Sequence, residues 1–129
     1  MSTLNVANIQ STGSGYNDVV SFKNSSGTEN GVLCRAWLSF NGTGTVAIRA
    51  DFNISSVTDN GTGHYTINFD NAMVDADYAM GTVNQQDTGG GIRLINGRGT
   101  RTASAFPCDT RNGSNNLGDF NQNTICFFR

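Results

Sequence analysis

Residues 32–51 read VLCRAWLSFNGTGTVAIRAD, and this stretch decides the fold. From Val32 to Phe40 every second side chain is apolar, and these side chains would share one face of an extended chain. A period of two is typical of a β-strand with one buried face. The pair Asn41-Gly42 accepts positive φ, which favours a hairpin turn after that strand. In the return strand we expect Val46, Ile48 and Ala50 to lie on one face.

The same pattern continues outward from this hairpin. The further predicted strands cover residues 45–51, 52–58, 64–70, 78–84, 91–95, 100–106 and 124–129. Turn residues at 59–63 and 96–99 separate them, and the connection 71–77 is short, with room for one helical turn. The polar segment 107–123 is predicted to be a long loop. Short strands spaced by turns predict an all-β fold, a single antiparallel β-sandwich or jelly-roll-like domain over 32–129.

The first 31 residues differ from the rest of the chain. Two short apolar pieces, around Leu4 and Val19, are separated by Ser, Gly and Asn. Such a segment cannot form a core alone. We therefore predict an extended N-terminal arm over 1–31 that lies on its own domain, on neighbouring copies or on another protein.

Composition bounds the fold and the function. The chain has 129 residues, which is the size of one domain, and only 36% are apolar and 14% charged. Asn, Gly, Thr and Ser stand where an ordinary domain would have more apolar and charged residues, and these four residue types disfavour helices and suit turns. The net charge of -2 argues against nucleic acid as a partner, which would demand a basic surface. No apolar run approaches the roughly 20 residues of a membrane span, and the first ten residues are not those of a signal peptide.

The cysteine, histidine and acidic residues favour a protein that is not an enzyme. Cys34, Cys108 and Cys126 fit neither a disulfide framework nor a zinc site; we expect free thiols, with one internal pair left open. His64, the only histidine, is expected on the surface. Asp75 and Asp77 are expected in a solvated connection rather than at a cation, and the glycine-rich segment 85–91 is expected to be a loop tip. Asp109 and Asp119 leave a glycosidase pair as a minor alternative. We predict no enzyme and no cofactor.

One longer pattern resembles a known family. Residues 34–49 (CRAWLSFNGTGTVAIR), 52–63 (FNISSVTDNGTG), 65–69 (YTINF) and 75–78 (DADY) are similar to a recurring stretch in tail-fibre-like virion proteins of marine tailed phages, especially cyanophages. The resemblance implies a trimeric β-domain at the distal end of a fibre, with host recognition by exposed loops and no catalytic residues. The chain is short for a fibre, so two locations stay open, a tail fibre and a capsid decoration.

These expectations define candidate partners and contact residues. We predict a homotrimer, because the apolar share is small for the core of a monomer, and a virion protein assembled in the bacterial cytoplasm. The arm is predicted to bind other virion proteins, and the loops 85–91 and 107–123 to bind a host cell-surface glycan or protein. The predicted receptor contacts are Asp109, Arg111, Asn112, Asn115, Asn116 and Asp119. Solvation or contacts between subunits are the alternative role for these loops. Trp37 and Phe40 are expected in the core or at a subunit interface.

Overall fold

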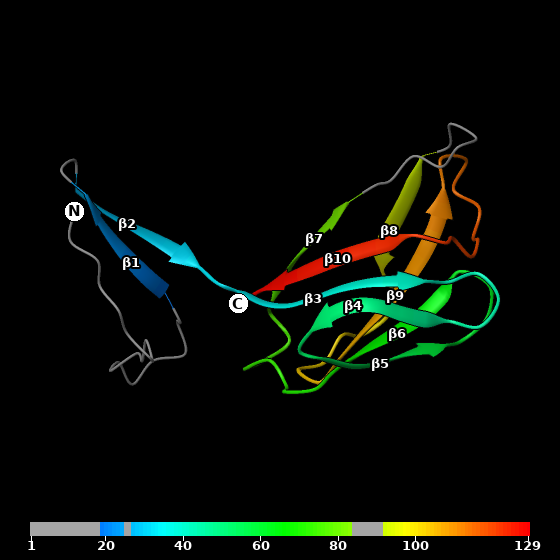
Figure 1. Cartoon of the computed structure of the whole chain (residues 1–129), viewed down its shortest axis with the longest axis horizontal. Helices are drawn as coiled ribbons and strands as arrows, with labels where there is room; N and C mark the ends of the chain where they lie inside the picture. Colours follow the sequence, from blue (N-terminus) through cyan, green and yellow to red (C-terminus); the bar gives the residue numbers. More distant parts are fainter. Residues whose placement is uncertain (1–18, 25–26, 84–91) are drawn as a thin grey trace.

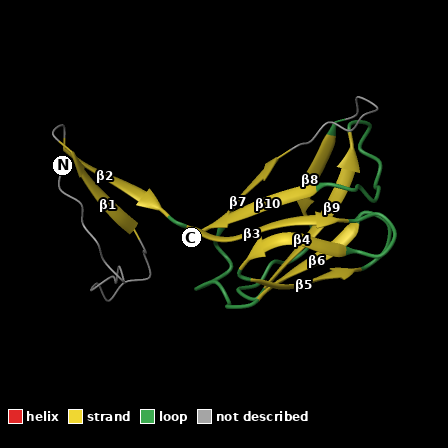
Figure 2. Ribbon diagram, viewed as in Figure 1, coloured by secondary structure: helices red, strands yellow, loops and turns green. Residues whose placement is uncertain are grey.

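The computed structural model describes residues 19–24, 27–83 and 92–129, and this part of the chain contains strands and loops but no helix (Figures 1 and 2). The strands are β1 Val19–Asn24, β2 Gly27–Val32, β3 Cys34–Asn41, β4 Ala47–Phe52, β5 Ile54–Asp59, β6 His64–Phe69, β7 Ala79–Val83, β8 Arg93–Gly97, β9 Ala105–Asn112 and β10 Asn123–Phe128.

Eight of these strands form a β-sandwich, as predicted. One antiparallel sheet has the order β4-β3-β10-β7 and the other has the order β5-β6-β9-β8. The hairpins β3–β4, β5–β6 and β8–β9 each stay within one sheet, whereas the other connections cross between sheets. The chain therefore closes two four-stranded layers around one core (Figure 1).

The core follows the alternation in the sequence. In β6 the alternating side chains Tyr65, Ile67 and Phe69 lie inward, and in β10 Ile125 and Phe127 do the same. The buried apolar side chains are Ala36, Leu38, Phe40, Ile54, Tyr65, Ile67, Phe69, Met73, Tyr78, Ile95, Phe106, Cys108, Ile125 and Phe127. The ring of Phe127 lies edge-on to three other rings at centroid distances of 5.0–5.7 Å. This packing closes the core within one chain, so a small core is no longer an argument for a trimer.

Part of the predicted arm forms a separate hairpin. Strands β1 and β2 pair antiparallel from Val19↔Val32 to Asn24↔Gly27. In Figure 1 this hairpin lies beside the start of β3, apart from the two sheets, and the C-terminus lies at the same end of the sandwich. Residues 1–18, 25 and 26 of the predicted arm lie outside the described residues, and the attachment of the arm 1–31 to other virion proteins stays a prediction.

Single-residue bulges changed two predicted faces. Cys34 was expected beside Ala36, but the register shifts there, Arg35 is the extra residue, and Cys34 is exposed. A second shift leaves Arg49 without a partner in β3, so Ile48 and Ala50 no longer share a face. Strand β4 is exposed along its whole length.

The predicted boundaries of two strands were wrong. The predicted strand 52–58 is divided, because Asn53 has a φ of 59° and forms a corner between β4 and β5. Its side chain fixes the corner through bonds to the carbonyls of Arg35 and Asn71 and from the Asn71 amide. The connection 71–77 contains no helical turn and instead carries Met73 into the core.

The predicted strand 100–106 and the start of the predicted loop 107–123 were also wrong, because β9 begins at Ala105 and continues to Asn112, which leaves residues 113–122 as the loop. Pro107 suggested a break. The carbonyl of Pro107 accepts from the Arg98 amide, on the side where β8 has already ended at Gly97. Since the N and O of one residue face the same neighbour in an antiparallel pair, the missing N–H of Pro107 costs no bond to β6.

Candidate functional site

Three loops meet at the end of the sandwich that lies away from the β1–β2 hairpin (Figure 1). They join β3 to β4 (residues 42–46), β5 to β6 (residues 60–63) and β9 to β10 (residues 113–122). We call these three segments the loop end. The third loop contains much of the segment in which the sequence predicted receptor contacts.

Asp119 ties the three loops together. Its Oδ1 accepts from the Tyr65 hydroxyl at 2.6 Å and from the Gly63 amide at 2.7 Å. The Tyr65 oxygen is also 3.2 Å from the Gly42 carbonyl, to which it can donate. Burial raises the pKa of Tyr65 well above its ordinary value, and the hydrogen bond to Asp119 and its charge raise it further. The Tyr65 hydroxyl therefore stays protonated and neutral, and it donates its hydrogen bond to the Asp119 carboxylate.

Backbone bonds make the same connection. The Thr110 amide donates to the Gly63 carbonyl at 2.8 Å, and the Thr110 hydroxyl donates to the Gly118 carbonyl at 2.6 Å. Gly63 has a φ of 68°, and a Cβ there would lie 2.8 Å from backbone atoms of Gly118 and Thr110. Only glycine allows this approach, so the loops are held in one arrangement.

The tip of the third loop is a hydrogen-bonded turn. The Asn112 side chain accepts from the amides of Ser114 and Asn116, and Asn115 takes a φ of 66°. Arg111 donates to the Asn115 carbonyl at 3.0 Å. The exposed amide side chains of Asn115 and Asn116 have no hydrogen-bond partner among the described residues. The turn thus presents two uncommitted amide groups from a fixed backbone.

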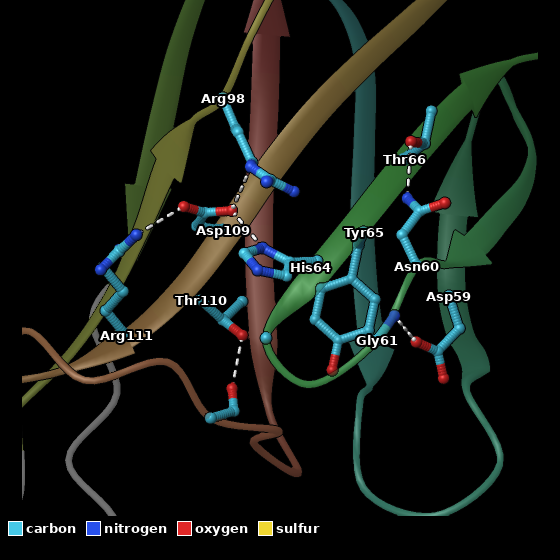
Figure 3. A network of polar contacts seen from close by, with 12 residues as sticks. Asp59, Asn60, Gly61, His64, Tyr65, Thr66, Arg98, Asp109, Thr110 and Arg111 are labelled. Carbon is cyan, nitrogen blue, oxygen red and sulfur yellow. Dashed lines mark hydrogen bonds and ion pairs between the residues drawn. The ribbon is translucent and has the colours of Figure 1, made fainter.

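A second polar cluster lies on the outer face of the β5-β6-β9-β8 sheet. Figure 3 shows Arg98, His64 and Arg111 around the carboxylate of Asp109. Asp109 Oδ1 lies 2.7 Å from His64 Nδ1 and 3.5 Å from Arg98 Nε, and Oδ2 accepts from Arg111 Nη2 at 2.8 Å. Burial alone would raise the pKa of Asp109, but the hydrogen bonds from Arg111 and His64 and their charges outweigh it and lower the pKa.

The six predicted receptor contacts therefore divide into different roles. Asp109, Arg111 and Asn112 belong to β9 rather than to a loop, and Asp109 is only 6% exposed. Arg111, Asn112 and Asp119 hold the turn or the loop end in place. Asn115 and Asn116 are exposed at the tip, as a contact requires. The predicted contact loop 85–91 lies outside the described residues.

His64 has a partner that the sequence did not indicate. It was expected on the surface, but its side chain is 22% exposed and paired with Asp109. The two residues face each other across β6 and β9, 45 positions apart. Among the described residues, no hydroxyl or thiol is hydrogen-bonded to the other ring nitrogen, Nε2. Asp109 and Asp119 belong to separate networks, one on the sheet face and one at the loop end.

Asp75 and Asp77 lie in the connection before β7. Asp75 accepts from the Asp77 amide and pairs with Arg129, which holds the pKa of Asp75 below its ordinary value, with help from that amide. Within 19–24, 27–83 and 92–129, no three His, Cys, Asp or Glu side chains are grouped as metal ligands would be. The same residues include no helix with the length and hydrophobicity of a membrane span.

Comparison of the chain with protein-family models, with curated proteins and with solved structures gives no match.

Proposed function

We propose that this chain is a virion structural protein of a tailed phage, and that its sandwich attaches to the host surface through the loop end. The observation that carries the proposal is the tie at Asp119, which joins three loops by hydrogen bonds while the exposed amides of Asn115 and Asn116 have no partner among the described residues. Rigid scaffolds that present polar loops are typical of binding proteins. The N-terminal hairpin lies at the other end, where an attachment to the particle would leave the loops free.

A surface glycan or protein suits these groups. Each amide offers two donors and an acceptor, which match sugar hydroxyls and peptide groups. One such hydrogen bond contributes only about 0.5–1.5 kcal/mol net. Useful affinity then requires several copies acting together, and a homotrimer with parallel loop ends would supply this avidity.

An exposed apolar row supports the homotrimer part of the proposal. Phe52, Trp37 and Cys126 are register partners across β4, β3 and β10, so their side chains share the outer face of that sheet. Phe52 is 54% and Trp37 38% exposed. Burying such a row between copies would be favourable at about 25 cal/mol per Å². Light scattering on the purified protein tests this, and a monomer at micromolar concentration would contradict it.

Capsid decoration is the second candidate function. The same apolar row favours it, because a shell protein would cover this face as well as a sister copy would. Immunogold labelling of intact virions separates the two candidates. Label at the tail tip supports attachment, whereas label over the head supports decoration.

The contact role of the tip is tested by the double variant Asn115→Gly, Asn116→Ala. Glycine keeps the positive φ at position 115, so the variant removes both amides without straining the turn. We expect adsorption of virions to host cells to fall about tenfold or more, with normal assembly. The matched control is Asn96→Ala, an exposed amide on β8 outside the loop end. Normal adsorption by the double variant would refute the contact role, and failed assembly would favour a contact between subunits.

A further inference from the structure

Exposed aliphatic side chains flank the tip of the third loop. Leu94 of β8 and Leu117 of that loop are the register partners of Arg111 on its two sides, so these three side chains share one face. Ile92, two positions before Leu94, lies against the tip, because a Cβ added at Gly113 would be 3.4 Å from the Cβ of Ile92. Ile92 is 60% and Leu117 36% exposed. We call Ile92, Leu94 and Leu117 the aliphatic patch.

Hydrogen bonds fix the backbone that carries this patch. Arg111 donates from Nη1 to the Asn115 carbonyl at 3.0 Å. It also donates from Nη2 to the Asp109 carboxylate at 2.8 Å (Figure 3). On the far side of the turn, the Gly118 amide donates to the Thr110 carbonyl at 3.2 Å. A surface that is already ordered loses little conformational freedom on binding. The patch and the free amides of the tip are therefore presented together by one fixed turn.

The loop end offers little aromatic surface to a sugar. Within residues 42–46, 60–63 and 113–122 the one aromatic side chain is Phe120. The guanidinium of Arg93 lies over its ring, 4.3 Å from the centroid. Gly118 approaches the far end of the same ring, where an added Cβ would be 2.9 Å from Cζ. A pyranose binds an aromatic ring through C–H groups, whose partial positive charge suits the negative face of the ring. One face of Phe120 is already taken by a cation.

The three loops also offer no free charge to an ionic partner. Asp119 is their one ionisable side chain, and it is bonded to Gly63 and Tyr65. What remains for a partner is aliphatic surface beside two unpaired amides. Protein interfaces combine an apolar centre with a polar rim, and a side-chain amide pairs well with peptide N–H and C=O groups. We infer that the partner of the loop end is a protein surface, with an apolar side chain on the aliphatic patch and peptide groups on Asn115 and Asn116.

This inference rests on the proposed function and decides between the glycan and the protein that the proposed function leaves open. Virions are adsorbed to host cells that have been treated with proteinase K, with sodium periodate or with buffer alone. Proteinase K removes exposed surface proteins, whereas periodate cleaves the vicinal diols of sugars and leaves peptide bonds intact. We expect proteinase K to abolish adsorption and periodate to leave it unchanged.

Two variants test the patch itself. Ile92→Ser and Leu117→Ser shorten exposed side chains, so the melting temperature should stay close to that of the wild type. Each should lower adsorption to untreated cells about tenfold, because each removes one aliphatic side chain from the contact. Val74→Ser is the matched control, because Val74 is 39% exposed and lies in the connection before β7, outside the loop end.

Each failure has a distinct result. Adsorption that survives proteinase K, or that periodate abolishes, would overturn the protein partner, and these two treatments use the unaltered virion, so they decide even where a variant melts early. Wild-type adsorption by both patch variants, or an equal loss in Val74→Ser, would overturn the patch. Normal adsorption by Asn115→Gly, Asn116→Ala to untreated cells would instead refute the proposed function, and this inference with it.

Discussion

Removal of the Asp119 carboxylate should weaken the loop end, although the backbone bond from Thr110 to Gly63 remains. In Asp119→Ala, Gly63 loses the acceptor for its amide at 2.7 Å, and the Tyr65 hydroxyl keeps only the Gly42 carbonyl at 3.2 Å. A hydrogen bond to a charged group is worth about 1.5–3 kcal/mol. Two such bonds are lost, but Asp119 is exposed and water replaces part of the loss. We expect the free energy of unfolding to fall by about 2–4 kcal/mol.

Two further variants isolate the contact with Tyr65. Tyr65→Phe removes the hydroxyl and leaves the bond from Gly63, so we expect a loss of about 1–3 kcal/mol. In the double variant the losses should not add, and the coupling energy should be about 1–2 kcal/mol. Asp119→Asn is the matched control, because its amide oxygen can still accept from both donors. It should retain more stability than Asp119→Ala.

Urea denaturation followed by tryptophan fluorescence measures all four variants, since Trp37 is the one tryptophan of the chain and lies outside the loop end. An Asp119→Ala protein within about 0.5 kcal/mol of the wild type would refute the role of this carboxylate as a tie. A coupling energy near zero would show that Tyr65 and Asp119 act independently, despite the short distance between them.

Three other predictions use the same protein. Gly63→Ala should lower the free energy of unfolding by about 3 kcal/mol or more, because the added Cβ would lie 2.8 Å from backbone atoms. Gly44→Ala, at a φ of 67° in open space, should lower it by only about 1–2 kcal/mol. Similar losses for the two variants in urea denaturation would contradict this. Burial, followed by the nearby charge of Asp109, raises the pKa of Cys108 to about 12, so at pH 8 a disulfide reagent should label exposed Cys34 and label Cys108 only after unfolding. Because the pKa of Asp109 is lowered in the folded protein, its carboxylate stabilises the fold at pH values above the ordinary pKa of about 3.9. This stabilisation is lost as the pH falls through the lower pKa of the folded protein. The melting temperature of Asp109→Asn should therefore lie below that of the wild type at pH 7 and approach it toward about pH 2; a constant difference would contradict this.

The fold was predictable wherever a strand keeps a strict period of two. Tyr65, Ile67 and Phe69 lie inward as their spacing indicates, and the turn after Asp59 begins where Asn60-Gly61 stands. The errors have a local cause that spacing cannot reveal. One extra residue in a bulge inverts the face of every residue beyond it, as happens at Arg35 and Arg49.

The candidate site was less predictable, because its contacts join residues far apart in the chain. Asp119 and Tyr65 are 54 positions apart, and His64 and Asp109 are 45 apart. Composition marked the third loop as polar but could not separate the side chains that hold it from those left free. The sequence held one usable signal for the turn. Asn115 stands close to Asn112 and Gly113, and Asn and Gly are the residues that most readily take the positive φ found at Asn115.

The bulge at Arg49 also changes which side chains lie on the outer face of this sheet. Because the register shifts there, Ala50 faces outward beside Ser39, and Phe52 lies opposite Trp37 on the outer face. Strand β4 thereby adds apolar surface to the outside of a core that is already closed by Phe127 and its neighbours. Bulges at sheet edges usually turn an edge away from other chains. Here the bulge places Phe52 beside Trp37 instead, on the surface that the proposed trimer or shell contact would bury.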